Sequence, residues 1–202
     1  MESEDRKHQI ILESTRLFSQ SGFDRVTIKQ LADACGITEP ALYRYFPSKD
    51  AIYDAVLDSI QSQMQYQELF ARLEKEPEIG EVLFGLARHI LGFFTTHREL
   101  YRLLLYSTLG EHSKAKAVYL MIRGPFIFFL LEQLKRLAAE GKLKPKNFEI
   151  TARCFVGMVF DCALSGMVWR GFTGRTYEPD EIIANNIPIF IDGLSAPKAP
   201  GA

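Results

Sequence analysis

The sequence contains few of the residues and motifs that build disulfide, metal or catalytic centres. Only three of its 202 residues are cysteine. Cys154 and Cys162 would lie about 12 Å apart along one helix, which is too far for a disulfide. The four histidines show no metal-ligand spacing, and we find no glycine-rich phosphate loop, nucleophile motif or pair of catalytic carboxylates. We therefore predict no enzymatic activity, no metal and no cofactor, while redox or metal sensing stays open as an alternative.

The chain also lacks a large net charge. Its formal net charge is -1 at pH 7 and its sequence pI is ≈ 6.4, whereas nucleic-acid-binding domains are often strongly basic. Residues 1–50 contain seven basic and eight acidic side chains. Three of the basic ones, Lys29, Arg44 and Lys49, nevertheless fall within residues 27–53. This distribution argues against a protein that binds nucleic acid through charge alone.

No segment has the alternating pattern of a β-strand, and no apolar run is long enough for a membrane span. The longest run, residues 154–169 (CFVGMVFDCALSGMVW), would measure about 24 Å as a helix against about 30 Å of bilayer core. It must therefore be covered by protein. The charged first residues, MESEDRKHQ, show no signal-peptide pattern. We expect an all-α, cytoplasmic protein without membrane association.

The most informative pattern lies in residues 27–53, TIKQLADACGITEPALYRYFPSKDAIY. Thr27 and Gln30 match the Thr-x-x-Gln capping box that begins a helix, and apolar residues then follow at helical spacing on one face. Gly36 can take the positive φ that ends a helix. Thr38 can cap the next helix, with Pro40 in its first turn. The pattern predicts two short helices joined by a tight turn, which is a helix-turn-helix.

The second of these short helices is expected to present one face to the core and the other to DNA. Leu42 and Phe46 share the inward face at i, i+4 spacing. Pro47 disfavours helical geometry at Phe46, and Ser48 can cap a third helix. The helix N-termini at Thr27 and Ser48 present free amides that can bind phosphate. The side chains left for DNA are Thr38, Glu39, Pro40, Ala41, Tyr43, Arg44 and Tyr45.

Over about residues 8 to 60 the chain resembles the TetR-type bacterial transcriptional regulators. The resemblance rests on Leu17-Phe18, Gly22-Phe23, Thr27-Ile28, Leu31-Ala32, Gly36-Ile37-Thr38, Leu42-Tyr43, Tyr45-Phe46 and Ser48-Lys49-Asp50. It implies an N-terminal three-helix DNA-binding domain and a larger C-terminal helical domain for ligand binding and dimerisation. We place these domains at residues 1–50 and 51–195, followed by a disordered Pro/Ala/Gly tail at residues 196–202.

The resemblance also implies roles for individual side chains. Phosphates would be held by Thr27, Tyr43, Tyr45 and Lys49, and base edges would be approached by Thr38, Glu39, Pro40, Ala41 and Arg44. Glu39 departs from the family pattern, in which a basic, small or polar residue is more usual. A carboxylate there repels phosphate but can accept a hydrogen bond from a cytosine amine. Core packing of Tyr43 or Tyr45, and a solvated surface role for Arg44, stay open.

Helix-capping residues and prolines predict several helix boundaries in the rest of the chain. A helix capped by Ser48 is expected to continue along apolar positions as far as Met64. Thr96 and Glu99 form a second predicted capping box. The last helix is expected to be kinked or interrupted at Pro188.

The second domain is rich in aromatic side chains, which together with Met commonly line small-molecule pockets. The candidate effector-binding residues are Phe84, Phe93, Phe94, Tyr101, Tyr106, Tyr119, Met121, Phe126, Phe129 and Asp161. Ordinary core packing is the alternative for each aromatic residue. Gly124-Pro125 is expected to bend a helix, either beside a cavity or for packing alone.

Asp161 interrupts the apolar run of residues 154–169, where an unpaired carboxylate is costly to bury. We therefore expect it to meet a cation or a hydroxyl, within the chain or across a dimer, or to contact a cationic ligand. Small residues in this run allow close helix approach, and the resemblance implies dimerisation through the last two long helices. The candidate interface residues are Gly157, Ala163, Ser165, Gly166, Trp169, Ile189 and Phe190.

The sequence thus predicts a ligand-responsive transcriptional repressor. It would bind a near-palindromic double-stranded DNA operator as a homodimer and be released by a small, hydrophobic or aromatic effector. Activation, or a ligand that acts as corepressor, stays open within the same class. Two other classes also stay open: a helical carrier or enzyme with a non-functional DNA-binding head, and an architectural protein with little sequence preference.

Overall fold

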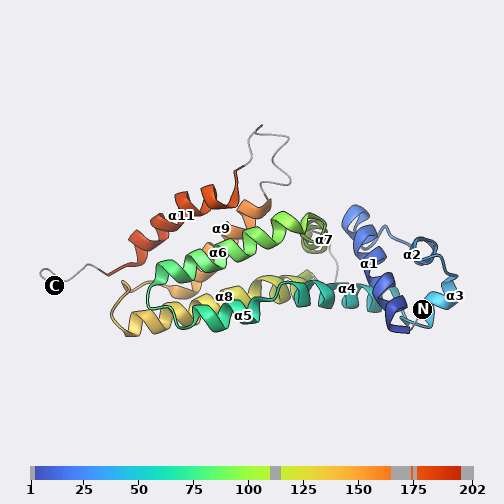
Figure 1. Cartoon of the computed structure of the whole chain (residues 1–202), viewed down its shortest axis with the longest axis horizontal. Helices are drawn as coiled ribbons and strands as arrows, with labels where there is room; N and C mark the ends of the chain where they lie inside the picture. The colour runs from blue at the N-terminus through green and yellow to red at the C-terminus, as the bar shows by residue number, and fades with distance from the viewer. Residues whose placement is uncertain (1–2, 110–114, 165–173, 175–176, 197–202) are drawn as a thin grey trace, which may run out of the picture. The chain divides into compact units, whose positions relative to one another are not determined.

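The computed structural model describes residues 3–109, 115–164, 174 and 177–196, and these residues are mainly helical (Figure 1). The helices are α1 (Ser3–Ser21), α2 (Ile28–Ala34), α3 (Glu39–Tyr43), α4 (Lys49–Gln63), α5 (Tyr66–Leu73), α6 (Ile79–Thr96), α7 (Arg98–Leu109), α8 (Ala115–Ala139), α9 (Phe148–Leu164) and α11 (Pro179–Leu194). None of the described residues belongs to a β-strand, although Leu143 and Ser195 form an isolated antiparallel bridge. The all-α prediction is confirmed.

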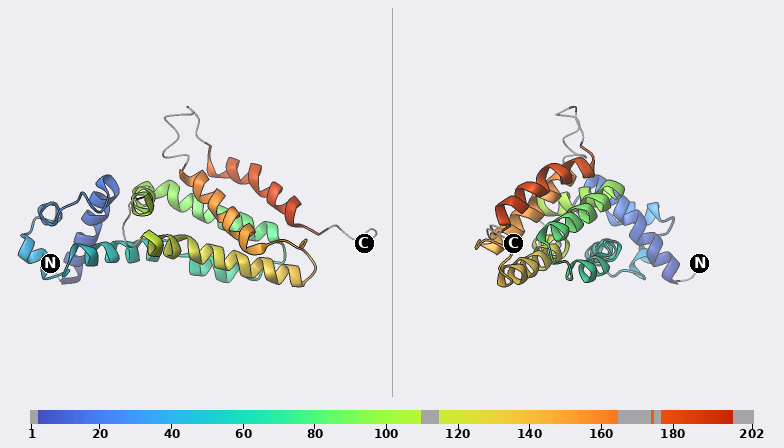
Figure 2. Two further views of the ribbon diagram at one scale, coloured as in Figure 1. Left: turned by 180° about the vertical axis from the view of Figure 1, so that it is seen from behind. Right: turned by 60° about the vertical axis from the view of Figure 1, so that its left-hand side comes forward.

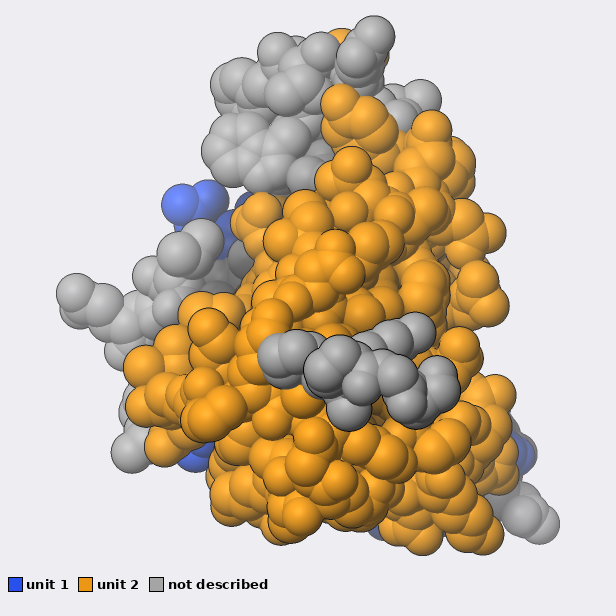
Figure 3. Space-filling view, turned by 90° about the vertical axis from the view of Figure 1, so that its left-hand side faces the viewer, with its two compact units in different colours: residues 1–64, 97–122 blue, residues 65–96, 123–202 orange. Residues whose placement is uncertain are grey.

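The chain divides into two compact units (Figure 3). Unit 1 comprises residues 1–64 and 97–122, and unit 2 comprises residues 65–96 and 123–202. Helix α8 therefore contributes residues to both units. The predicted domain boundary after residue 50 stays a prediction.

Unit 1 is built around α1, which packs against α2, α4 and α7. Phe18 of α1 is fully buried, and its ring centroid lies 5.6 Å from that of Phe23 and 5.3 Å from that of Tyr53. Helix α4 contributes a buried apolar stripe at the predicted spacing, formed by Ile52, Val56, Ile60 and its C-cap Met64. These rings and branched side chains hold the short helices α2 and α3 on a rigid support.

Unit 2 is organised around α6, which packs against α5, α9 and α11 (Figure 2). Its inward side chains, among them Leu86, Ile90 and Phe94, are buried. Gly85 lets α5 approach this helix closely, because a β-carbon at that position would lie 2.6 Å from Cδ2 of Leu73. Aromatic rings from α6, α8 and α9 fill much of the core, with Phe94, Phe126 and Phe160 almost fully buried.

One predicted helix boundary is wrong. Thr96, expected to cap a new helix, is the last residue of α6, and its hydroxyl donates to the carbonyl oxygens of Gly92 and Phe93 at 3.2 and 2.9 Å. Helix α7 begins two residues later, at Arg98. A threonine hydroxyl can cap the following helix or donate back into its own, and the sequence pattern does not distinguish the two.

The helices that contain proline remain continuous. Helix α11 runs through Pro188, so the interruption expected there is absent, and α8 runs through Pro125. Over the described ranges of the chain, no helix combines the length and apolar character that a membrane span requires.

Candidate nucleic-acid interface

The first half of the helix-turn-helix is fixed by the predicted capping box. The backbone N–H of Thr27 donates to Oε1 of Gln30 at 2.8 Å, and the backbone N–H of Gln30 donates to Oγ1 of Thr27 at 3.2 Å. The two residues therefore satisfy each other's backbone groups at the start of α2. At the other end of α2, Nη1 of Arg6 donates to the carbonyl oxygen of Cys35 at 3.2 Å, which ties α1 to the turn.

The turn and α3 also form as predicted. Gly36 takes a positive φ of 64°, and the backbone N–H of Ala41 donates to Oγ1 of Thr38 at 3.4 Å. Pro40 lies in the first turn of α3. Leu42 is fully buried, and Phe46 is 9% exposed. The inward face of this segment is therefore confirmed, and its other side chains are free to face outward.

The start of α4 adds a third capped N-terminus and a lysine held by an aromatic ring. Oγ of Ser48 accepts a hydrogen bond from the backbone N–H of Ala51 at 3.1 Å. Lys49 is the first residue of α4, and its Nζ lies 4.2 Å from the centroid of the Phe23 ring. Burial lowers the pKa of the Lys49 ammonium from its ordinary value, and the nearby Asp24 and Asp50 carboxylates oppose that shift.

The structure brings the predicted DNA contacts together on α2, α3 and the start of α4 within unit 1. Six of them are exposed, namely Thr27, Thr38, Glu39, Pro40, Tyr43 and Arg44, and three are half-buried, namely Ala41, Tyr45 and Lys49. Tyr43 is 48% exposed, so it is not a core aromatic residue. The arrangement offers three helix N-termini and two cationic side chains to a phosphate backbone. Contact of each residue with DNA stays a prediction.

Sequence patterns did not identify Phe23 as part of this site, although the Gly22-Phe23 pair belongs to the family resemblance. The Phe23 ring lies 4.8 Å from the Tyr53 ring and supports Lys49. Phe23 and Lys49 are far apart in the sequence, so no periodicity or capping rule connects them. Only the packing of the α1–α2 connection onto α4 brings them together.

The residues predicted to bind an effector fall in both compact units. Phe84, Phe93, Phe94, Phe126, Phe129 and Asp161 belong to unit 2, and Tyr101, Tyr106 and Met121 belong to unit 1. The side chain of Tyr119 lies outside the described residues. Several of the rings pack on one another, as Phe93 does on Phe94 with centroids 5.1 Å apart. Tyr106 is 44% exposed and lies against Gly22.

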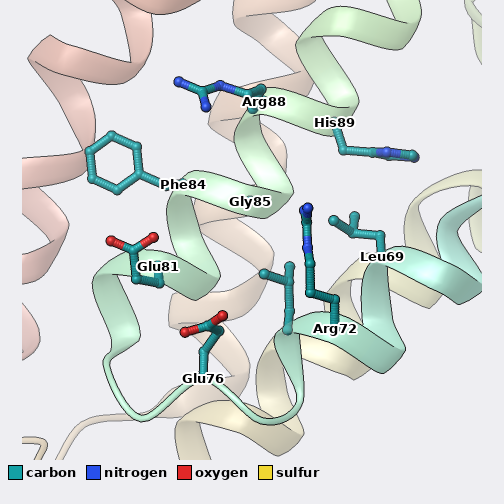
Figure 4. Close-up of a pocket in the computed structure, with 9 residues that line it drawn as sticks. Leu69, Arg72, Glu76, Glu81, Phe84, Gly85, Arg88 and His89 are labelled. Atoms are coloured by element: carbon teal, nitrogen blue, oxygen red, sulfur yellow. The ribbon is translucent and has the colours of Figure 1, made fainter.

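A pocket of ≈ 420 Å³ lies between α5 and α6 in unit 2, and charged residues form much of its lining (Figure 4). Its lining residues are Leu69, Arg72, Leu73, Glu76, Glu81, Phe84, Gly85, Arg88 and His89. Of the predicted effector-binding residues, Phe84 alone is among them. Sequence reasoning missed the others because charged residues on an amphipathic helix ordinarily face solvent.

The predicted dimer residues that the structure describes lie on α9 and α11. Gly157, Ala163 and Phe190 are half-buried, and Ile189 is 66% exposed. Ser165, Gly166 and Trp169 lie outside the described residues. Asp161 is exposed in the single chain, so the expected cost of burying its carboxylate does not arise there. The homodimer stays a prediction.

Part of the chain matches a known protein family, and the chain as a whole is similar to a curated protein and to solved structures. Residues 10–56 match the model of the bacterial regulatory proteins of the tetR family. The chain is 29% identical over 184 residues to the nucleoid occlusion factor SlmA of Alteromonas mediterranea, which covers 86% of this chain and 89% of that relative. Its fold is similar to that of AibR, solved in complex with isovaleryl coenzyme A and operator DNA, with a TM-score of 0.71, 17% identity and coverage of 92% and 98%. It is also similar to a tetR-family transcriptional regulator from Streptomyces coelicolor, with a TM-score of 0.62, 22% identity and coverage of 91% and 78%.

Proposed function

We propose that this chain, which belongs through residues 10–56 to the TetR family of bacterial regulatory proteins, is a transcriptional repressor that binds a specific DNA operator as a homodimer. Its family membership makes it a DNA-binding regulator. Repression, the homodimer and the near-palindromic operator are the proposal. The observation that carries it is the exposed face of α3 between the capped N-termini of α2 and α4.

This arrangement supports sequence-specific binding in two steps. The amides at the N-termini of α2 and α4, together with Lys49, would hold phosphates and so set the position of α3 in the major groove. Thr38, Glu39 and Arg44 are exposed on or beside α3 and can then reach base edges. In a homodimer, two such helices would read half-sites about one helical turn apart or a small multiple of that distance.

We further propose that a small-molecule effector binds the helical part of the chain and releases it from DNA. An effector can do this only if it binds more tightly to a conformation that does not fit the operator. Helix α4 begins with Lys49, which is proposed to bind phosphate, and it ends at Gln63, next to the last residue of the first segment of unit 1. A shift of α4 would therefore change the position of the DNA-binding face. An effector that left operator affinity unchanged would refute this mechanism.

The direct test is a selection of binding sites from a random duplex DNA pool with the purified protein at near-physiological salt. We expect a near-palindromic sequence to be recovered, and a dimer on the recovered site in analytical ultracentrifugation. Tyr43→Ala and Lys49→Ala should weaken retention of that site without changing the sedimentation of the free protein. Retention without sequence preference, in both the absence and the presence of candidate corepressors, would contradict the proposal.

The curated relative suggests a second candidate function. It carries the name of a nucleoid occlusion factor, and its match extends over most of both chains. This supports a role in which the same surface binds chromosomal DNA at many sites and does not regulate one promoter. Genome-wide occupancy separates the two, because a repressor occupies a few promoters and a nucleoid factor occupies many dispersed sites.

A further inference from the structure

The pocket between α5 and α6 contains charged side chains that have no partners in the structure. Within the described part of the chain, the side chains of Arg72, Glu76 and Glu81 make no hydrogen bond and no ion pair. Arg88 has one exposed ion pair, with Oδ1 of Asp180 at 3.4 Å, and such pairs hold their partners weakly. The pocket therefore presents positive and negative charge that a ligand could engage.

Arg88 and Glu81 place the two signs of charge at opposite ends of one face of α6. Figure 4 shows Arg72 on one side of Gly85 with Leu69 and His89, whereas Arg88, Phe84 and Glu81 lie together on the other side. Arg88 and Glu81 lie seven residues apart on α6, which places them on one face about 10 Å apart along the axis. The charge separation therefore follows the length of α6.

Two side chains that do not line the pocket help to fix its shape. Nη2 of Arg136 donates to the carbonyl oxygen of Glu76 at 2.7 Å, and Nζ of Lys142 donates to the carbonyl oxygen of Pro77 at 2.9 Å. These bonds hold the connection between α5 and α6. Leu73 packs directly on Gly85, and Leu73 and Phe84 provide apolar surface in the lining. A volume of ≈ 420 Å³ falls within the range of small-ligand sites.

A strained residue adjoins the same groove. A second pocket, of ≈ 360 Å³, shares Leu69, Arg72 and His89 with the first and extends to Gln65. Gln65 has φ 45° and ψ 36°, a left-handed conformation that residues other than glycine seldom adopt. Such conformations cluster at ligand clamps and switches, which independently favours a binding role for this groove.

We propose that the groove between α5 and α6 binds an extended zwitterion, a molecule with a carboxylate and an ammonium group about 10 Å apart and an apolar middle. Arg88 binds the carboxylate, Glu81 with the nearby Glu76 binds the ammonium, and the apolar middle lies along α6 over Phe84. ω-Amino acids and short peptides share this chemistry, since three extended residues span about 10 Å. The site goes beyond the proposed DNA-binding function and is tested without DNA.

The test measures binding of a matched set of probes to the purified full chain by isothermal titration calorimetry. The extended zwitterion is 8-aminooctanoate, and octanoate and octylamine each lack one of its charges. We expect 8-aminooctanoate to bind about tenfold more tightly than either analogue. Glycine, in which the two charges are adjacent, should not compete. Trialanine distinguishes the two ligand classes. A site for short peptides should bind trialanine at least as well as 8-aminooctanoate, whereas a site for ω-amino acids should bind trialanine less well.

Two substitutions test which pocket side chain binds each charged group of the probe. Arg88→Gln should remove the advantage of 8-aminooctanoate over octylamine, and Glu81→Gln should remove its advantage over octanoate. Arg102→Gln and Glu78→Gln remove exposed charges that do not line the pocket, and they should leave all affinities unchanged. Equal affinities for the three probes, or an unchanged preference in both pocket variants, would overturn the proposal. Absence of binding by both 8-aminooctanoate and trialanine would also overturn it.

Discussion

The Nζ atom of Lys49 lies 4.2 Å from the centroid of the Phe23 ring, and that ring packs against Tyr53 with centroids 4.8 Å apart. A cation over an aromatic face is attracted by the quadrupole of the ring. The contact restricts the ammonium group at the first residue of α4, beside the helix N-terminus capped by Ser48. Phe23 thus positions the lysine that is proposed to bind phosphate.

Lys49→Met should weaken DNA binding and reduce its dependence on salt. Met keeps the apolar stem over Phe23 but removes the charge that would displace a counterion from DNA. We expect the slope of log affinity against log salt concentration to fall by about one per protomer. Fluorescence anisotropy on the selected operator across a potassium chloride series measures this slope. Lys75→Met, which removes an exposed charge in unit 2, serves as the control, and an equal slope in both variants would contradict the role of Lys49.

Phe23→Leu should weaken operator binding mainly through Lys49. Leucine keeps an apolar side chain in the cluster but provides no aromatic face for the ammonium group. In a double-mutant cycle with Lys49→Met, we expect a coupling free energy of about 0.5–1 kcal/mol for operator binding. Urea unfolding of each variant corrects for lost stability. If the two substitutions are additive, Phe23 supports only the core.

Thr27→Ala should destabilise unit 1 by about 1 kcal/mol, because it removes the N-cap of α2 and one half of the capping box. Urea unfolding at neutral pH measures this loss. Thr95→Ala is a matched control, since the Thr95 hydroxyl donates only within its own helix, to the carbonyl oxygen of Leu91 at 2.7 Å. An equal or greater loss in the control would show that the capping box contributes little.

The parts of the site that the sequence predicted depend on neighbours a few residues away. The caps at Thr27, Thr38 and Ser48, and the positive φ at Gly36, are set by local backbone geometry. Spacing of apolar residues likewise predicted the buried face of α4. Thr96 shows the limit of such rules, because it is the last residue of α6 and α7 begins at Arg98, one residue later than the predicted cap requires.

The parts that the sequence did not predict depend on packing between distant segments. The pairing of Phe23 with Lys49 needs α4 to lie against the end of α1, and the charged pocket needs α5 to approach α6 at Gly85. The aromatic residues predicted to bind an effector stay a prediction. Some of these rings pack on other rings, since Phe94 and Phe160 have centroids 5.4 Å apart and bury their surfaces against each other.

The cysteines of α9 should report on the proposed dimer. Cys154 is exposed in the single chain, whereas burial and the nearby Asp161 carboxylate raise the pKa of the Cys162 thiol and keep it protonated. In dilute protein at pH 7.5, iodoacetamide should therefore modify Cys154 before Cys162, as measured by peptide mass spectrometry. Reaction of Cys162 should increase as the pH rises towards its raised pKa. If α9 forms the interface, labelling of Cys154 should slow with increasing protein concentration. Labelling that is independent of concentration across the dimerisation range would place the interface elsewhere.

Gln65 separates α4 from α5, and substitutions there test whether the break is required. Its left-handed conformation, with φ 45°, is much less accessible to a β-branched residue. If the break is required by the surrounding packing, Gln65→Val should destabilise the chain by about 1–2 kcal/mol in urea unfolding. Gln65→Gly should stay within about 1 kcal/mol of the parent, because relief of strain offsets the greater freedom of glycine in the unfolded chain. Stability equal to the parent in Gln65→Val would mean that this residue can turn right-handed, which would allow α4 and α5 to join into one helix.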